Sequence, residues 1–168
     1  MNYSRNDLIN AEATFNQMRN AIYHLARFMV KNNVSDVQER LRRMGRNIGR
    51  TFINYWKPTD LVSTSNVKDV ITTIYKKIVN STVSIEINKE DKIFIVRDYK
   101  CPLCKYKYED INISGCEILI SLVAEFINLI NKESNDPLAL FLEPLRVKES
   151  KAYGHNVCML EFRYKLGG

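Results

Sequence analysis

Histidine and tryptophan are scarce in this sequence, and no long hydrophobic run occurs. The 168 residues include only two histidines and one tryptophan. None of the six glycines belongs to a phosphate-binding or dinucleotide-binding pattern. No window approaches the roughly eighteen apolar residues that a membrane span requires. We therefore expect neither a nucleotide-dependent enzyme nor a membrane-spanning chain.

The lack of histidine also limits the catalytic chemistry. A nucleophilic site with a histidine base would have to use His24 or His155. His24 falls within a predicted helix and His155 within a predicted turn, and neither stands in a catalytic pattern. The zinc-deaminase signature, which pairs a glutamate with a ligating histidine, is missing too. We therefore predict a protein that binds something and is not an enzyme.

The composition is typical of a globular domain. Hydrophobic residues make up 45% of the chain and charged residues 26%, and the formal net charge is +6. A chain of this length can bury most of its apolar surface, so we expect one domain over residues 1–168. The first residues lack the apolar run of a secretory signal, which favours a cytoplasmic protein. In that compartment cysteines are more often metal ligands or free thiols than disulfides.

Hydrophobic periodicity predicts the order of the helices and strands. Apolar residues recur at helical spacing over 6–31, 37–55 and 67–78, with Ser35 as N-cap of the second helix and Pro58 as its stop. The later elements are a β-hairpin, a strongly apolar helix capped by Ser114 and expected to be buried on most sides, and a second hairpin, over 83–96, 115–131 and 138–164. Three helices, two strands, one helix and two strands predict an α+β fold.

The four cysteines carry the most specific signal. Cys101 and Cys104 form a Cys-Pro-Leu-Cys segment directly after a predicted strand. Cys116 falls in the first turn of the apolar helix, where the positive helix-end potential favours a thiolate. Cys158 begins the last predicted strand. We predict that these four thiolates bind one Zn²⁺ ion, and because they leave no open position for water the site would be structural.

Two alternatives stay open for the cysteines. The Cys-Pro-Leu-Cys segment could be a redox pair, with Cys116 and Cys158 as ordinary buried apolar residues. Pro102 and the polar residues that follow favour a loop, however, whereas a thioredoxin-like motif places its first cysteine at a helix start. His155 is the reserve zinc ligand if one cysteine lies out of reach.

The second predicted helix has two further features. Gly45 and Gly49 each cost about 1 kcal/mol against alanine, which suggests that another backbone packs closely against them. The same helix carries five arginines that could contact phosphates, although a solvated face is the ordinary explanation: Arg40, Arg42, Arg43, Arg46 and Arg50.

Three stretches together resemble the vinyl-4-reductase-like domain family, which includes hydrocarbon-binding proteins, sensor domains of phenol-responsive activators and core subunits of the TRAPP vesicle-tethering complex. Residues 41–49, with their Met-Gly-Arg-Asn-Ile-Gly core, are similar to a helix of the tethering subunits. Residues 114–116 are similar to the cysteine-headed helix of the sensor domains. Residues 153–162 are similar to the closing glycine-turn, cysteine and strand motif. The resemblance covers roughly residues 41–164.

The resemblance implies a metal site with altered ligands. The sensor domains hold zinc, and Cys116 and Cys158 match two of their ligand positions. The other two positions fall at Val147 and Ser150, which are poor zinc ligands. The Cys-Pro-Leu-Cys pair would take their place.

The resemblance also implies a fold, an assembly and a ligand. The fold is a two-layer domain with helices packed on a four-stranded antiparallel sheet, and the assembly is a homodimer through the early helices. The long apolar stripe of the first helix agrees with a dimer seam in residues 1–33. The tethering subunits carry an acylated cysteine where this chain has Leu61 and Val62, so covalent lipid attachment is not expected. An apolar pocket for a hydrocarbon-like or aromatic ligand is expected among six residues that could equally fill the core: Phe52, Tyr55, Trp56, Leu119, Val123 and Phe126.

Three functional hypotheses follow. The leading one is a zinc-stabilised domain that binds a small apolar molecule and acts as a sensor. The second is a dimeric scaffold of the tethering type with no free ligand. The third is a basic regulator that binds nucleic acid through its second helix.

Overall fold

The computed structural model describes residues 4–167, so residues 1–3 and 168 of the expected 1–168 domain lie outside the described residues. Its elements follow in the predicted order, with a 3₁₀ turn, η1 (Lys151–Tyr153), before the last strand. The predicted α+β fold with a four-stranded antiparallel sheet is confirmed. The helices are α1 (Arg5–Lys31), α2 (Val37–Phe52), α3 (Val67–Ile78) and α4 (Cys116–Asn131), and the strands are β1 (Val83–Asn88), β2 (Ile93–Asp98), β3 (Leu140–Glu149) and β4 (Cys158–Leu166).

The sheet brings distant segments of the chain together. Its strand order is β1-β2-β4-β3, and every neighbouring pair is antiparallel. Asp98, the last residue of β2, pairs with Cys158, the first residue of β4. The segment that follows β2 therefore starts beside Cys158 at one end of the sheet.

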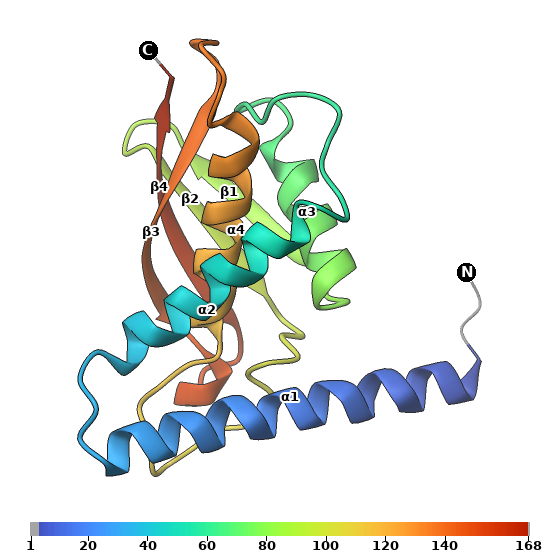
Figure 1. Cartoon of the computed structure of the whole chain (residues 1–168), viewed down its shortest axis with the longest axis vertical. Coiled ribbons are helices and arrows are strands. Elements are labelled where there is room, and N and C mark those ends of the chain that lie inside the picture. The colour runs from blue at the N-terminus through green and yellow to red at the C-terminus, as the bar shows by residue number, and fades with distance from the viewer. Residues whose placement is uncertain (1–3, 168) are drawn as a thin grey trace.

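Helix α4 forms the centre of the molecule (Figure 1). It packs against β3 and β4 on one side and against α2 on another, and most of its residues are buried. At its last turn the side-chain amide of Asn131 bonds the backbone of Val62 and the carbonyl oxygen of Leu140. The predicted burial of this helix on most sides is confirmed.

Helices α2 and α4 meet backbone to backbone. A Cβ atom on Gly45 would lie 2.1 Å from the carbonyl oxygen of Ile118. A Cβ atom on Gly49 would lie 3.0 Å from the carbonyl oxygen of Leu122. Because only glycine permits such an approach, the predicted packing reason for the two glycines is confirmed.

The bounds of α2 differ from the prediction at both ends. Its N-cap is Asp36 and not Ser35, since the turn before the helix places Asp36 in the left-handed region at φ 58°, which aspartate tolerates. The helix ends at Phe52, before Tyr55 is reached. The helix gives way to a turn there, and the ring of Trp56 stacks on the ring of Phe126 in α4.

Helix α1 is attached in a different way. Its N-terminal part extends past the rest of the molecule, at the lower right of Figure 1, and it approaches α2 at only a few positions. All of its buried residues lie in its second half: Arg19, Ile22, Tyr23, Ala26 and Met29. None of the described helices is both long enough and apolar enough to cross a bilayer.

Candidate metal centre

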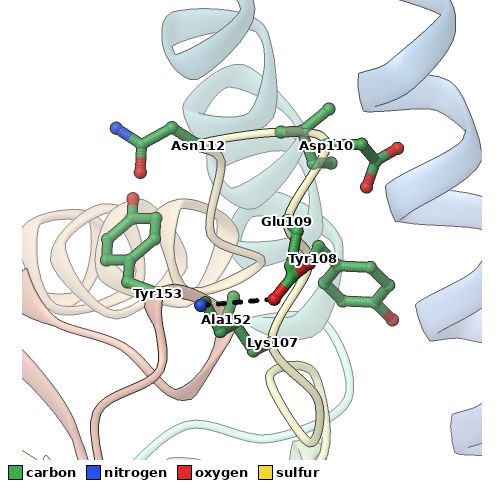
Figure 2. Close-up of a pocket in the computed structure, with 8 residues that line it drawn as sticks. Lys107, Tyr108, Glu109, Asp110, Asn112, Ala152 and Tyr153 are labelled. Carbon is green, nitrogen blue, oxygen red and sulfur yellow. Dashed lines mark ion pairs between the residues drawn. The ribbon is translucent and has the colours of Figure 1, made fainter.

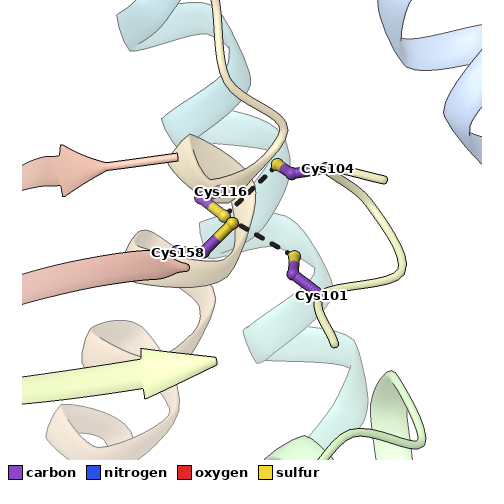
Figure 3. A group of neighbouring side chains, drawn as sticks. All are labelled: Cys101, Cys104, Cys116 and Cys158. Atoms are coloured by element: carbon purple, nitrogen blue, oxygen red, sulfur yellow. Dashed lines mark hydrogen bonds between the residues drawn. The ribbon is translucent and has the colours of Figure 1, made fainter. Parts of the chain in front are cut away.

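The four cysteine side chains meet at one point. The sulfur atoms of Cys101, Cys104, Cys116 and Cys158 all lie within 4.8 Å of one another, and all four residues are buried. The sulfur of Cys116 is 3.4 Å from that of Cys104 and 3.6 Å from that of Cys101. Figure 3 shows the four side chains converging from opposite sides. The structure thus brings together every cysteine that the sequence singled out.

Three parts of the fold supply these cysteines. Cys101 and Cys104 lie in the loop after β2, where the Cys104 N–H donates to the Cys101 carbonyl oxygen at 3.4 Å and closes a tight turn. Cys116 is the first residue of α4, and Cys158 is the first residue of β4. The cluster therefore joins the first hairpin, the central helix and the last strand.

Hydrogen-bond donors surround the sulfur atoms. The Tyr23 hydroxyl of α1 donates to the Cys104 sulfur at 3.5 Å. The backbone N–H of Lys151 donates to the Cys158 sulfur at 3.5 Å. Donors of this kind orient metal ligands and stabilise their charged form, so they are the surroundings expected of a thiolate site.

Ser114 belongs to these surroundings and does not cap α4 as predicted. The N-cap of the helix is Gly115, one residue later. The Ser114 hydroxyl instead accepts from the Cys116 N–H at 3.1 Å and lies 3.3 Å from the Cys104 sulfur. It also contacts the buried Ser150 hydroxyl at 2.8 Å. Two buried serines therefore fix the backbone around the cluster.

The thiols perturb one another's ionisation. The bond to the Cys104 sulfur raises the pKa of Cys101, and contacts with Cys101 and Cys104 raise the pKa of Cys116. Burial opposes ionisation of Cys104, yet the bonds from the other thiols and from Ser114 lower its pKa. Without a cation the cluster favours the thiolate form of Cys104. A bound cation would stabilise the thiolate form of all four cysteines, so the cluster is suited to bind one.

The geometry of the cluster fits a tetrahedral zinc ion. Zinc–sulfur bonds of about 2.3 Å place the four sulfur atoms about 3.8 Å apart. Two of the separations in the structure, 3.4 Å and 3.6 Å, lie close to that value, and none exceeds 4.8 Å. Because all four ligands would be protein thiolates in a buried site, no coordination position would be left for a substrate.

His155 does not join the cluster. It is exposed in the turn before β4, and its Nδ1 lies 3.1 Å from the Ser150 carbonyl oxygen. Cys101, the first cysteine of the Cys-Pro-Leu-Cys segment, lies in a loop and not at a helix start. This placement lacks the geometry of a thioredoxin-like redox pair.

Sequence reasoning missed the two α1 residues that meet this centre. The Arg19 guanidinium donates to the carbonyl oxygen of Pro102, between the first two cysteines, at 2.7 Å, and Arg19 is only 1% exposed. The apolar spacing that predicted this helix includes Met18 and Leu25, which are exposed, among the residues Leu8, Ala11, Phe15, Met18, Ile22, Leu25 and Met29. The buried face of the helix includes Arg19 and Tyr23. The hydrophobic pattern of the sequence did not indicate that an arginine would be buried there.

An apolar pocket of about 230 Å³ lies beside the cysteine cluster. Its walls come from α1, α2, α4, the end of α3 and Leu103, the residue between Pro102 and Cys104. All of its lining side chains are apolar: Met18, Ala21, Ile22, Met44, Ile48, Ile78, Val79, Leu103, Ile118, Leu119 and Leu122.

The six residues expected to line a pocket are placed in four ways. Leu119 lines the apolar pocket, and Val123 is buried in the core. The rings of Phe52, Trp56 and Phe126 pack on one another, with Trp56 stacked on Phe126 at 5.5 Å between ring centres. Tyr55 is 81% exposed and lies with Phe52 at a shallow surface hollow.

Three of the α2 arginines are paired with carboxylates. Arg42 bonds the buried Glu117 of α4 at 2.7 Å, and Arg50 bonds Glu125 of the same helix at 2.7 Å. Arg46 bonds a glutamate within α2. This pairing leaves less positive charge for phosphates than the run of arginines suggests.

The molecule thus combines helices packed on a four-stranded antiparallel sheet with a buried cluster of four thiols. Among solved structures, the chain is similar to trafficking protein particle complex subunit 3 from Naegleria fowleri covalently bound to palmitic acid. The TM-score is 0.66 at 14% sequence identity, and the match covers 94% of this chain and 96% of that one. This likeness shows a TRAPP-related fold. No protein-family model and no curated protein matches the sequence.

Proposed function

We propose that this chain is a non-catalytic binding subunit, a relative of the vinyl-4-reductase-like domains, that takes a hydrocarbon-like or aromatic ligand. In this proposal a structural zinc ion at the four cysteines stabilises the fold. The observation that carries the proposal is the apolar pocket beside the cysteine cluster. An apolar cavity of about 150 Å³ can bind benzene. The 230 Å³ pocket is therefore large enough for an aromatic ring or a short stretch of hydrocarbon chain.

The solved neighbour holds palmitic acid covalently. In this chain all four cysteines belong to the buried cluster, so no further thiol is present to form a thioester. The proposed binding is therefore reversible, and apolar contact would supply its free energy.

Calorimetric titration of the purified protein with decanoic acid tests the ligand. We expect saturable binding with a negative heat-capacity change, since apolar surface is buried. Ala21 lines the pocket but is exposed, so Ala21→Trp fills the pocket from outside and should abolish saturable binding. Ala13, also exposed on α1 but away from the pocket, gives the matched control Ala13→Trp. Equal binding by both variants would contradict the proposal.

A dimeric scaffold is the second candidate function. Large apolar side chains along α1 are exposed to solvent, and their helical spacing is that of a packing seam. They include Leu8, Met18, Leu25 and Phe28. Light scattering during gel filtration should then give twice the mass of the chain. Leu25→Glu should produce the monomer, whereas Ala13→Glu should not, and a monomeric parent protein would remove this candidate.

A further inference from the structure

The polar anchors of α1 converge on one short segment. Among the described residues, every side-chain hydrogen bond that α1 exchanges with a distant part of the chain ends within residues 102–115. The two buried anchors are Arg19, on the Pro102 carbonyl oxygen, and Tyr23. The Tyr23 hydroxyl donates to the Cys104 sulfur and accepts from the Gly115 N–H at 3.1 Å.

Further contacts of α1 reach the same segment at the surface. The Tyr23 ring stacks on Tyr108 with 3.9 Å between ring centres. Arg27 pairs with Asp110, and Lys105 pairs with Glu12 at 2.8 Å. The polar contacts of α1 with distant parts of the chain therefore go to this segment, and the backbone of α1 approaches that of α2 at only a few positions.

The segment has little structure of its own. Residues 101–113 contain no helix or strand. Only two backbone–backbone hydrogen bonds involve them, Cys104 N–H to the Cys101 carbonyl oxygen and Tyr108 N–H to the Ala152 carbonyl oxygen. Residues 107–112 line a surface pocket together with Ala152 and Tyr153, whose side chains Figure 2 shows. The pocket has a volume of about 310 Å³. A segment so poorly bonded needs another source of order, and Cys101 and Cys104 place its first part at the metal centre.

The same elements form a wall of the apolar pocket. Met18, Ala21 and Ile22 come from α1, and Leu103 comes from the segment between the first two cysteines. If Leu103 and α1 moved away together, the pocket would lose this wall and open to solvent.

We infer that metal binding assembles the apolar pocket. Zinc at the four cysteines orders residues 101–113, the ordered segment holds α1 through Arg19 and Tyr23, and α1 with Leu103 closes the pocket. This inference rests on the proposed function and adds a coupling between its two sites. Because such coupling is reciprocal, an apolar ligand must raise the affinity for zinc by the same factor by which zinc raises the affinity for the ligand.

Two measurements on the full chain test the coupling. Zinc content and decanoic acid binding are first measured on the metal-loaded protein. These two results test the proposed function and do not yet test the coupling. The metal is then removed with a chelator. We expect the affinity for decanoic acid to fall at least about tenfold, and amide exchange in residues 19–31 to rise by about the same factor while α2, α4 and the sheet stay protected.

Each outcome bears on the inference. Unchanged exchange in α1 after zinc removal would overturn it, and so would a loss of protection spread over the sheet, because the metal would then hold the whole domain. The double variant Arg19→Met/Tyr23→Phe gives a second test without metal removal. It should keep one zinc ion per chain yet lose decanoic acid affinity about tenfold. Unchanged affinity in that variant would also overturn the inference.

Discussion

Helices α2 and α1 both cover the central part of the molecule, but they are attached by different means. Helix α2 lies directly on α4, and the backbones meet at Gly45 and Gly49. The polar side chains of helix α1 bond the segment of residues 102–115. Among them, Tyr23 is fully buried and bonds the Cys104 sulfur. The first attachment needs only the packing of two helices. The second depends on whatever keeps this segment in place.

Because of this difference, substitutions at the two attachments should have different effects. Close packing of α2 on α4 is all-or-none, because a backbone contact tolerates no added atom. The attachment of α1 combines a few buried apolar side chains with hydrogen bonds, stacked rings and surface ion pairs, and each polar contact is of modest strength. A change at the backbone contact of α2 with α4 should therefore destabilise the whole protein, whereas a change at the polar contacts of α1 should loosen one helix.

Gly45→Val should have the largest effect on stability. A Cβ atom at residue 45 would lie 2.1 Å from a carbonyl oxygen of α4, so the two helices would have to separate. We expect a loss of at least about 4 kcal/mol in the free energy of unfolding, or no folded protein at all. Urea denaturation followed by circular dichroism measures it. Asn47→Ala, at an exposed position between the two glycines, is the control and should change stability by about 0.5 kcal/mol or less.

Arg42→Met should have the next largest effect. It leaves the Glu117 carboxylate, which is 1% exposed, without its ion-pair partner. Removing one member of a buried pair costs about 3 kcal/mol, because a buried charge stays uncompensated. The double variant Arg42→Met/Glu117→Leu should recover most of that loss in the same urea experiment. A double variant no more stable than the single one would show that the pair does not join α2 to α4 in this way.

Tyr23→Phe should affect α1 alone. It removes the hydroxyl that bonds the Cys104 sulfur and the Gly115 N–H, at a cost of about 1 kcal/mol. Hydrogen exchange should speed up in α1 and stay unchanged in α2. Tyr75→Phe is the matched control, since its buried hydroxyl has no hydrogen-bond partner among the described residues and its loss should cost almost nothing. Equal effects of the two substitutions would mean that the Tyr23 hydroxyl does not anchor α1.

Asp110→Asn should have the smallest effect. Its hydrogen bond with Arg27 lowers the pKa of Asp110 below the ordinary value of 3.8. The pair therefore contributes in full above about pH 4. Its contribution is lost only as the pH falls toward the lowered pKa. Between pH 6 and 8 the substitution should slightly speed amide exchange in α1. The ratio of the exchange rates of variant and parent should not depend on pH, and a ratio that changes with pH in that range would contradict this assignment.

The fold was largely predictable because its signals are local. The 3.6-residue and 2-residue periods identify the helices and strands from neighbouring residues. Gly45 and Gly49 also predicted that another backbone packs closely against α2, because two glycines in one helix lower its stability unless a close neighbour requires them. The end of α2 was placed too late, because the stacking of Trp56 on Phe126 depends on tertiary contact.

The cysteine cluster was predictable from residue chemistry, but its surroundings were not. Four cysteines at the ends of elements suggest a common ligand before any geometry is known. Tyr23 is 81 residues away from the Cys104 sulfur that it bonds, and no local pattern marks such a contact. Sequence periodicity also gave no signal that Arg19 lies on the buried face of α1, because burial of this arginine depends on a carbonyl oxygen that lies far along the chain.

The coordination of zinc by these cysteines can be measured by X-ray absorption at the zinc edge, on protein purified in zinc-containing medium. We predict one zinc ion per chain with four sulfur ligands at about 2.3 Å. Cys116→Ser should change this shell, since Cys116 Sγ lies near the sulfur atoms of both Cys101 and Cys104. Protein without stoichiometric zinc, or zinc bound by nitrogen and oxygen in place of sulfur, would contradict the metal centre and the attachment of α1 that depends on it.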